Sequence, residues 1–232
     1  MRTEKKFGGG GQGPVAQASR LWTLDSSPKP PPPTPYRGLG GEFEGRAGDL
    51  RSPGLPLNPL RLLLTGPPRC GKTTLVKKVV DTFPGRAGGF YTREVREKGE
   101  RVGFEIVTLN GQVAWLSHVN FPGPHRVGKY GVSLENLHRV ALPALEVKPG
   151  IDLVVVDEVG KMECLSPRFV EAMERLWAAS VPLLLTVAEK GGGYIQQVKG
   201  KPDKALITVT FANRDELPGR ILQLLKTVEG QG

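Results

Sequence analysis

The sequence has little of what marks a secreted or membrane-spanning protein. It contains two cysteines, Cys70 and Cys164, which are too few for a disulfide framework. It has no apolar run of about 18 residues, the length that a transmembrane helix needs. The start of the chain is basic, but it lacks an apolar stretch of signal-peptide length. We therefore expect a cytoplasmic protein with no membrane association.

Glycine and proline, by contrast, are abundant and unevenly distributed. Residues 1–58 hold 11 of the 31 glycines and 9 of the 21 prolines, with runs at 8–11 and 30–33. Such a segment cannot bury enough apolar surface to offset the entropy lost on ordering. We therefore expect a disordered Gly/Pro-rich leader at residues 1–58 and a single working domain at residues 59–232.

The charge is basic, and its excess is modest within the domain. The chain carries 32 basic and 23 acidic residues, for a net charge of +9. The leader has 8 basic and 5 acidic residues, so the domain keeps 24 basic and 18 acidic residues, or +6. A solvated basic surface explains this excess, and a phosphate-rich ligand or a nucleic acid is the alternative.

Short apolar runs alternate with amphipathic stretches throughout the domain. Strands linked through helices imply right-handed crossovers, and hence an α/β fold in which helices cover both faces of a parallel sheet. Five core strands are expected, at residues 61–65, 89–94, 151–157, 182–187 and 205–210. Helices are expected at residues 73–83, after Ser133, after Ser166 and near residues 213–227.

An antiparallel hairpin insertion is expected between the second and third core strands. A turn at Lys98-Gly99-Glu100 and an Asn110-Gly111 turn separate stretches that have strand-like patterns. Residues 120–131 are rich in Pro and Gly and are expected to be irregular. The insertion is expected at residues 102–119, with strands at residues 102–109 and 113–119, and its first strand could pair as a hairpin with the strand-like stretch at residues 90–95.

The strongest motif is GPPRCGKT at residues 66–73, which fits the Walker A pattern G-x-x-x-x-G-K-[ST]. It follows an apolar strand and opens a periodic helix, as a phosphate-binding loop requires. In this context the backbone N–H groups of the loop point at phosphate oxygens. Lys72 is expected to reach the β- and γ-phosphates, and the Thr73 hydroxyl to ligate Mg²⁺. A glycine-rich turn that only caps a helix is the alternative.

The second motif is LVVVDE at residues 153–158, where two acids end an apolar strand. This is the Walker B arrangement, which lies beside the phosphate loop if the two strands are neighbours or next-but-one. Asp157 is then expected to hold the metal through water, and Glu158 to act as the general base toward the attacking water. On its own the signal is weak, because strands often end in a solvated acid.

These motifs and several others resemble the nucleoside-triphosphatase family founded on thermostable bacterial NTP phosphatases, whose vertebrate member is called cancer-related nucleoside-triphosphatase. The resemblance spans residues 61–225 in family order. It implies a RecA-like P-loop NTPase fold that hydrolyses ATP, GTP and other nucleoside triphosphates to the diphosphate and phosphate, with broad base tolerance. The matching segments are residues 64–74, 89–96, 103–104, 127–132, 157–163 and 213–215.

At other matching positions the residues allow more than one role. Arg214 follows the last core strand, where it is expected to stack on the base or contact the triphosphate, while Asn213 is expected to cap the last helix. Lys161 touches a phosphate or pairs with Glu163 on the surface. Either Arg93 or Arg96 could stabilise γ-phosphate charge, although a solvated strand edge is the favoured interpretation. Ala212 departs from the family, which usually has Glu there, so no role transfers to it.

We therefore predict a nucleoside-triphosphatase that uses Mg²⁺ and acts as a monomer. The catalytic candidates are Lys72 and Glu158, and the metal candidates are Thr73 and Asp157. A kinase and a nucleotide-gated RNA-binding module stay open as alternatives. The expected lid at residues 189–201 has no arginine, which weighs against a kinase, and no RNA-binding aromatic signature is present. The nucleotide-binding candidates are Gly66, Pro67, Pro68, Arg69, Cys70, Gly71, Lys72, Thr73, Thr74 and Arg214.

Overall fold

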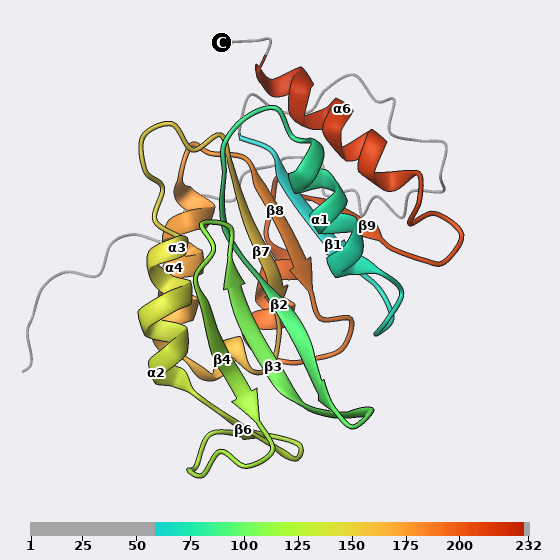
Figure 1. Ribbon diagram of the computed structural model, residues 1–232. Coiled ribbons are helices and arrows are strands. Elements are labelled where there is room, and N and C mark those ends of the chain that lie inside the picture. The colour runs from blue at the N-terminus through green and yellow to red at the C-terminus, as the bar shows by residue number, and fades with distance from the viewer. Residues whose placement is uncertain (1–58, 230–232) are drawn as a thin grey trace, which may run out of the picture. The chain divides into compact units, whose positions relative to one another are not determined.

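The structure is a computed structural model that describes residues 59–229. The expected leader at residues 1–58 lies outside the described residues. The described part contains a nine-stranded sheet in the order β5-β6-β4-β3-β2-β7-β8-β1-β9 (Figure 1). The strands are β1 (Arg61–Thr65), β2 (Ala87–Glu97), β3 (Glu100–Thr108), β4 (Val113–His118), β5 (Arg126–Val127), β6 (Tyr130–Val132), β7 (Leu153–Val159), β8 (Leu183–Val187) and β9 (Ala205–Thr208).

Two kinds of strand pairing divide this sheet. The strands β2, β7, β8, β1 and β9 pair in parallel, and they are the five core strands expected from the sequence. The strands β3 and β4 continue the sheet from β2 in antiparallel order, as the predicted insertion requires. Since β8 lies between β1 and β7, the strands that carry the two motifs are next-but-one neighbours. Their carboxyl ends therefore meet at one edge.

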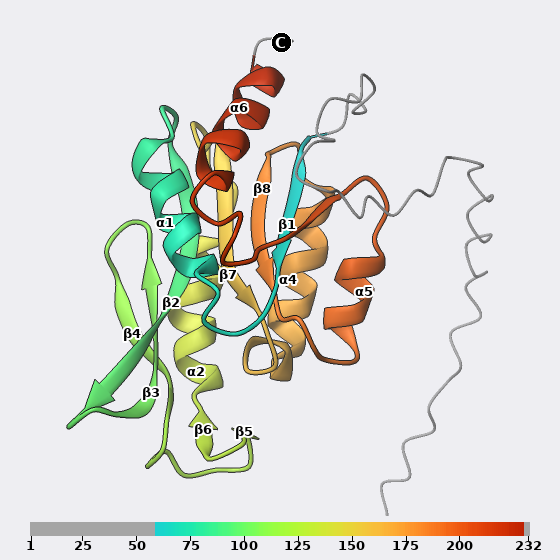
Figure 2. The ribbon, with the colours of Figure 1, turned by 90° about the vertical axis from the view of Figure 1, so that its right-hand side faces the viewer.

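Helices cover both faces of the parallel half of the sheet (Figure 2). On one face, α1 and α6 pack over alternate strand residues such as Leu62 and Leu64. On the other face, η1, α4 and α5 pack over the intervening residues, such as Leu63. This alternation follows from the two-residue period of a strand. The helices are α1 (Lys72–Thr82), α2 (Leu134–Asn136), η1 (Leu137–Ala141), α3 (Leu142–Ala144), η2 (Glu163–Leu165), α4 (Pro167–Ala178), α5 (Tyr194–Gly200) and α6 (Leu217–Glu229).

Two helix starts follow the predicted caps. The Ser133 hydroxyl accepts a hydrogen bond from the backbone N–H of Asn136 at 3.2 Å, and α2, η1 and α3 continue from it as one helix with a central π-helical stretch. The Ser166 hydroxyl accepts from the backbone N–H of Phe169 at 3.1 Å and starts α4. Both serines satisfy N–H groups that the helix itself leaves unpaired.

The structure differs from the sequence-based expectation in three places. Residues 120–131 are not wholly irregular, because the short strands β5 and β6 pair within and next to them. The segment after β8 contains the helix α5. The three glycines at residues 191–193 predict a loop there, and the helix begins directly after them. The last helix begins at Leu217 instead of Asn213, since Asn213 belongs to a separate turn and Pro218 fits the first helical turn.

None of the helices in residues 59–229 combines the length and the apolar character that crossing a lipid bilayer requires.

Candidate active site

The loop between β1 and α1 owes its shape to two glycines. Gly66 has φ 144° and Gly71 has φ 104°, a region that favours glycine. A Cβ on Gly66 would fall 2.3 Å from the carbonyl oxygen of Val209, so the loop packs directly against the segment that follows β9. The two glycines thus place the loop at the carboxyl edge of the sheet, with the N-terminus of α1 behind it.

Lys72 folds back over this loop. Its Nζ donates to the carbonyl oxygens of Gly66 at 3.0 Å and Pro67 at 3.3 Å. The amine therefore lies above the loop backbone, where the sequence predicted a phosphate contact. Cys70 is 1% exposed and packs into the core, so it can offer only its backbone to a ligand. Thr73 is half-buried and is the second residue of α1. The exposed residues around the loop are Pro67, Pro68, Arg69 and Thr74.

Asp157 is a buried acid that lies next to the start of α1. Its Oδ1 accepts a hydrogen bond of 2.5 Å from the Thr186 hydroxyl on β8, while its Oδ2 is buried and has no hydrogen-bond partner. Burial raises the pKa of Asp157, and the Thr186 and Thr73 hydroxyls and the charge of Lys72 oppose that rise. The sequence candidates Thr73 and Asp157 are thus brought together, at a carboxylate that has one free buried oxygen.

Glu158 follows in an irregular stretch of the ladder between β7 and β8. The regular register breaks between Val156 and Val159, and such bulges re-aim side chains. Burial raises the pKa of Glu158, the charge of Lys72 lowers it, and Asp157 raises it further. Glu158 is therefore a half-buried carboxylate with a higher basicity than a surface glutamate. It follows Asp157 directly and lies at the same sheet edge as Lys72.

Glu163 is a further carboxyl at this site, and the sequence interpretation misplaced it. The sequence predicts it only as a surface partner of Lys161, yet Glu163 is 4% exposed. Burial, with smaller contributions from Glu158 and Asp157, raises the pKa of Glu163 to about 8. Lys161 is exposed, and the recorded ion pairs of residues 59–229 do not join it to Glu163. The apolar neighbours Met162 and Cys164 were the signal that this segment turns inward.

Lys199 is a second residue that sequence reasoning did not assign to the site. It lies on α5, and its Nζ donates to the carbonyl oxygen of Glu189 at 2.7 Å. Its charge also lowers the pKa of Glu158, although less than that of Lys72 does. Burial lowers the pKa of Lys199 itself, while Glu189 and Glu158 raise it. The segment after β8 thus contributes the Lys199 cation, whose charge acts on Glu158.

Arg214 lies against the phosphate loop from the other side. A Cβ on Gly71 would come within 3.2 Å of its Cδ, so the arginine stem crosses the N-terminus of α1. Asn213 does not cap α6, because its side chain bonds to the backbone of Thr210 and Thr208. The sequence candidate Arg214 is therefore brought to the loop, by a turn at residues where the sequence predicts the start of a helix.

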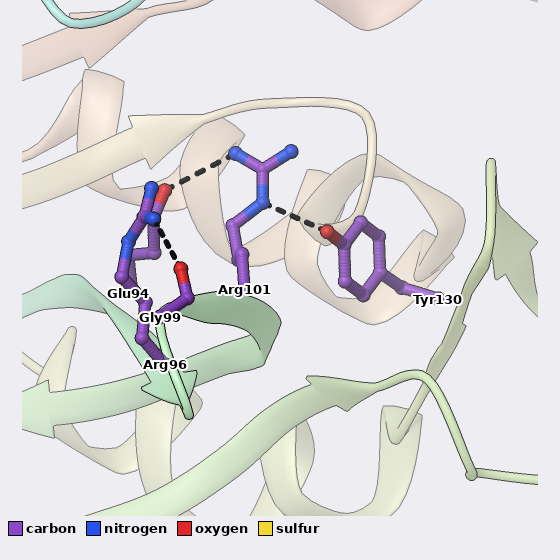
Figure 3. A network of polar contacts seen from close by, with 5 residues as sticks. All are labelled: Glu94, Arg96, Gly99, Arg101 and Tyr130. Atoms are coloured by element: carbon purple, nitrogen blue, oxygen red, sulfur yellow. Dashed lines mark hydrogen bonds and ion pairs between the residues drawn. The ribbon is translucent and has the colours of Figure 1, made fainter.

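Arg93 and Arg96 are bound within the hairpin of β2 and β3. Arg93 pairs with Glu105 at 2.6 Å, and Arg96 donates to Glu94 at 2.6 Å and to the Gly99 carbonyl at 2.8 Å. Figure 3 shows the second group, in which Arg101 also joins Glu94 to the Tyr130 hydroxyl. Since hairpin groups already bind both guanidinium groups, the structure favours the strand-edge interpretation over a γ-phosphate contact.

Comparison with known proteins gives consistent matches over this region. The profile of a family described as NTPase matches residues 61–222. A relative named nucleoside-triphosphatase THEP1, from Thermotoga sp. (strain RQ2), is 38% identical over 173 residues, which cover 74% of this chain and 99% of the relative.

Two solved structures are similar to the described fold. The crystal structure of THEP1 from Aquifex aeolicus has a TM-score of 0.66 at 33% identity, and the match covers 72% of this chain and 99% of that chain. The solution structure of a human cancer-related nucleoside triphosphatase has a TM-score of 0.63 at 34% identity, over 72% and 98% of the two chains. These matches confirm the P-loop NTPase fold that the sequence resemblance implied.

Proposed function

The chain belongs to the NTPase family, and from this premise we propose that it hydrolyses nucleoside 5'-triphosphates to the diphosphate and phosphate, with Mg²⁺ and with broad base tolerance. The observation that carries the proposal is the convergence of Lys72, Asp157 and Glu158 at one edge of the sheet. Lys72 lies just after β1 and the two acids lie near the end of β7, and these parallel strands end at the same edge of the sheet. The charge of Lys72 also lowers the pKa of both acids. We assign this activity to the domain at residues 59–232, apart from the leader.

The phosphate loop supplies the binding part of this function. The backbone N–H groups at the start of α1 and the positive end of its dipole face the space above the loop. Lys72 now bonds to two loop carbonyls, and a triphosphate would attract its amine away from them. Its charge then lies beside the γ-phosphate, where negative charge develops as the bond to the β-phosphate breaks.

The residues present fit a Mg²⁺ ion. Asp157 keeps one buried oxygen without a hydrogen-bond partner, and the Thr73 hydroxyl lies near it. The described residues contain no group of three or more His, Cys, Asp or Glu that could cage a metal. That is consistent with Mg²⁺, which keeps most of its ligands as water and phosphate oxygens. When bound, the ion would supply positive charge to the β- and γ-phosphate oxygens.

Glu158 is suited to accept the proton of the attacking water. In hydrolysis, water attacks the γ-phosphorus, the β–γ phosphoanhydride bond breaks, and one water proton must be taken up. A carboxylate whose pKa is raised by burial is a better base at neutral pH than one on the surface. Glu158 is half-buried, so solvent can reach it. We therefore assign it the role of general base.

A label experiment tests this proposal against its two alternatives. ATP labelled at the γ-phosphate is incubated with the full chain and Mg²⁺, with and without nucleotide or nucleic-acid acceptors. Free labelled phosphate without any acceptor is expected. Label that appears only on an acceptor would favour a kinase, and tight binding without turnover would favour a nucleotide-gated RNA-binding module.

The role of Glu158 is tested by Glu158→Gln. The amide keeps the shape and removes the base, so kcat should fall by roughly 100-fold or more, as expected when a general base is lost. Nucleotide affinity should change little. Glu135→Gln, at an exposed position on α2, is the matched control and should leave turnover at the wild-type level. Wild-type turnover by Glu158→Gln would remove Glu158 as the base.

A further inference from the structure

The described surface has one exposed aromatic ring beside the phosphate loop. Phe211 is 66% exposed, more than the other large apolar side chains at the surface, Val113 and Val147. An exposed ring of this size contributes nothing to the core, and it keeps apolar area in contact with water. Phe211 therefore has a surface available for a flat apolar ligand.

The turn that carries Phe211 is held by its own hydrogen bonds. The backbone N–H of Thr210 donates to Asn213 Oδ1 at 2.8 Å, and Asn213 Nδ2 donates to the carbonyl of Thr208 at 2.9 Å. The backbone N–H of Arg214 donates to the carbonyl of Thr210 at 3.1 Å. Phe211 thus projects from a fixed turn, so a ligand that binds its ring has little ordering entropy to overcome.

Arg214 connects this ring to the phosphate loop. Its guanidinium carbon lies 5.1 Å from the centre of the Phe211 ring, in a cation–π arrangement. Its Cδ lies 3.2 Å from the place where a Gly71 side chain would begin. The ring, the guanidinium group and the N-terminus of α1 therefore form a continuous surface. A ligand with phosphates at Gly71 can reach the ring with its other end.

We propose that Phe211, backed by Arg214, is the stacking surface for the nucleobase of the bound nucleotide. The inference rests on the proposed function for the phosphate end of the ligand, and it adds the site for the other end. Bases stack on aromatic rings and on arginine planes through their π-faces, which all four bases have. The ligand class is therefore purine and pyrimidine nucleoside triphosphates alike.

The polar side chains that flank the ring already have partners within the protein, and Asp215 also lies 3.8 Å from Arg214 Nε. The amide of Asn213 is used by the backbone of Thr208 and Thr210, and Ala212 has no polar side chain. Asp215 pairs with Lys78 at 3.3 Å. Selection among bases then depends on stacking strength, which is larger for the wider purines. Purine nucleotides should bind more tightly than pyrimidine nucleotides, and the difference should arise at Phe211.

The test compares Phe211→Ala and Phe211→Trp with the wild type in the full chain. Affinities of the β,γ-imido analogues of ATP and CTP and of inorganic tripolyphosphate are measured by calorimetry. Phe211→Ala should weaken the binding of both nucleotides by about 5- to 150-fold, the range for loss of one base–aromatic stack. It should also narrow the difference in affinity between the ATP and CTP analogues. The affinity for tripolyphosphate should stay unchanged, because that ligand has no base. Phe211→Trp should keep nucleotide affinity, and Val147→Ala should match the wild type.

Two results would overturn the inference. One is an unchanged nucleotide affinity in Phe211→Ala, and the other is an equal loss for nucleotides and tripolyphosphate, which would mean that the phosphate loop was disturbed. Failure of the proposed function looks different, because the wild type would then bind the analogues and release no phosphate from ATP. Turnover gives a further check, since a contact remote from the reacting bond should raise KM for ATP and leave kcat nearly unchanged.

Discussion

Thr186 and Asp157 are joined by a hydrogen bond of 2.5 Å between neighbouring strands, at the buried centre of the candidate site. Thr186 is fully buried and Asp157 is 1% exposed. The bond favours the ionised form of Asp157, whose pKa burial would otherwise raise further. It also fixes Oδ1, which leaves Oδ2 as the free oxygen that faces away from this partner. Thr186 therefore controls both the charge and the orientation of the proposed metal acid.

Replacing Thr186 with Val removes this donor without changing the shape of the side chain. Asp157 then loses a stabilising partner for its negative charge, so its affinity for Mg²⁺ should fall by about 10- to 100-fold, as when other outer-shell partners of a metal ligand are lost. The change is measured as the Mg²⁺ concentration that gives half-maximal turnover. Calorimetry of Mg²⁺ with a bound non-hydrolysable nucleotide provides a second measurement.

The control for this prediction is Thr186→Ser, which keeps the hydroxyl and should retain most of the Mg²⁺ affinity. If Thr186→Val and the wild type required the same Mg²⁺ concentration, the hydrogen bond would have no part in metal binding.

Glu163 should make the folded protein less stable as the pH rises. Its pKa is about 8 in the folded state because of burial, against roughly 4.3 for an exposed glutamate. Between these values the folded state holds a proton that the unfolded state has lost. The stabilisation is complete below about pH 4 and disappears as the pH rises toward 8, by up to about 1.4 kcal/mol per pH unit.

The variant Glu163→Gln carries a neutral group at every pH, so this part of the pH dependence should vanish. Urea unfolding between pH 5 and 9 should give a flatter curve for the variant, and a more stable variant at the alkaline end. Some slope should remain, because burial also raises the pKa of Asp157 and Glu158. Glu171→Gln, at an exposed position on α4, should follow the wild-type curve. Parallel curves for Glu163→Gln and the wild type would contradict the burial argument.

The sequence predicted the framework of the fold well, for physical reasons. The central parallel strands β1, β7 and β8 are buried almost throughout and are therefore apolar runs in the sequence, and all five parallel strands were found close to their expected places. The hydroxyls of Ser133 and Ser166 accept hydrogen bonds from backbone N–H groups only three residues later. Such short-range caps can be predicted from the neighbouring sequence alone. The start of α6 was wrong because Asn213 has the same residue type as a helix cap, while its partners are the preceding Thr208 and Thr210.

The candidate site was predicted only as far as its linear motifs extend. Lys72 and Asp157 belong to patterns in which spacing determines geometry, and the structure brings them together. Glu163 and Lys199 belong to no such pattern. Their places follow from the inward turn after β7 and from α5, neither of which a charged side chain reveals in the sequence. Phe211 is prominent only once its exposure is known.

Arg61 should be one of the larger single contributors to stability. Its buried guanidinium group donates to the carbonyl oxygens of Trp177 at 2.8 Å and Val181 at 2.6 Å, and also to that of Ala179. The Trp177 and Ala179 carbonyls lie at the end of α4, where the helix leaves its own acceptors unpaired, and Val181 lies in the connection to β8. Arg61→Leu would bury them without partners, at a cost of roughly 2–5 kcal/mol in the free energy of unfolding.

Urea unfolding measures the effect of Arg61→Leu. Arg61→Lys should be intermediate, because an ammonium group cannot reach three separate carbonyls in the planar geometry of a guanidinium. Arg175→Leu, at an exposed position on the same helix, should change stability by less than about 1 kcal/mol. Equal losses in Arg61→Leu and Arg175→Leu would show that the buried carbonyls do not depend on Arg61.

Lys199 should extend the pH range in which the protein is active toward lower pH. Its charge lowers the pKa of Glu158, and Glu158 must be ionised to act as a base. In Lys199→Met the pKa of Glu158 rises, so the acidic limb of kcat/KM should move to higher pH, while activity on the alkaline plateau changes little. Lys199→Arg keeps the charge and should keep the wild-type limb. An unshifted acidic limb in Lys199→Met would mean one of two things. Either the Lys199 amine does not act on Glu158, or Glu158 is not the group whose ionisation limits the rate. The position of the limb in Glu163→Gln would then show whether Glu163 is that group.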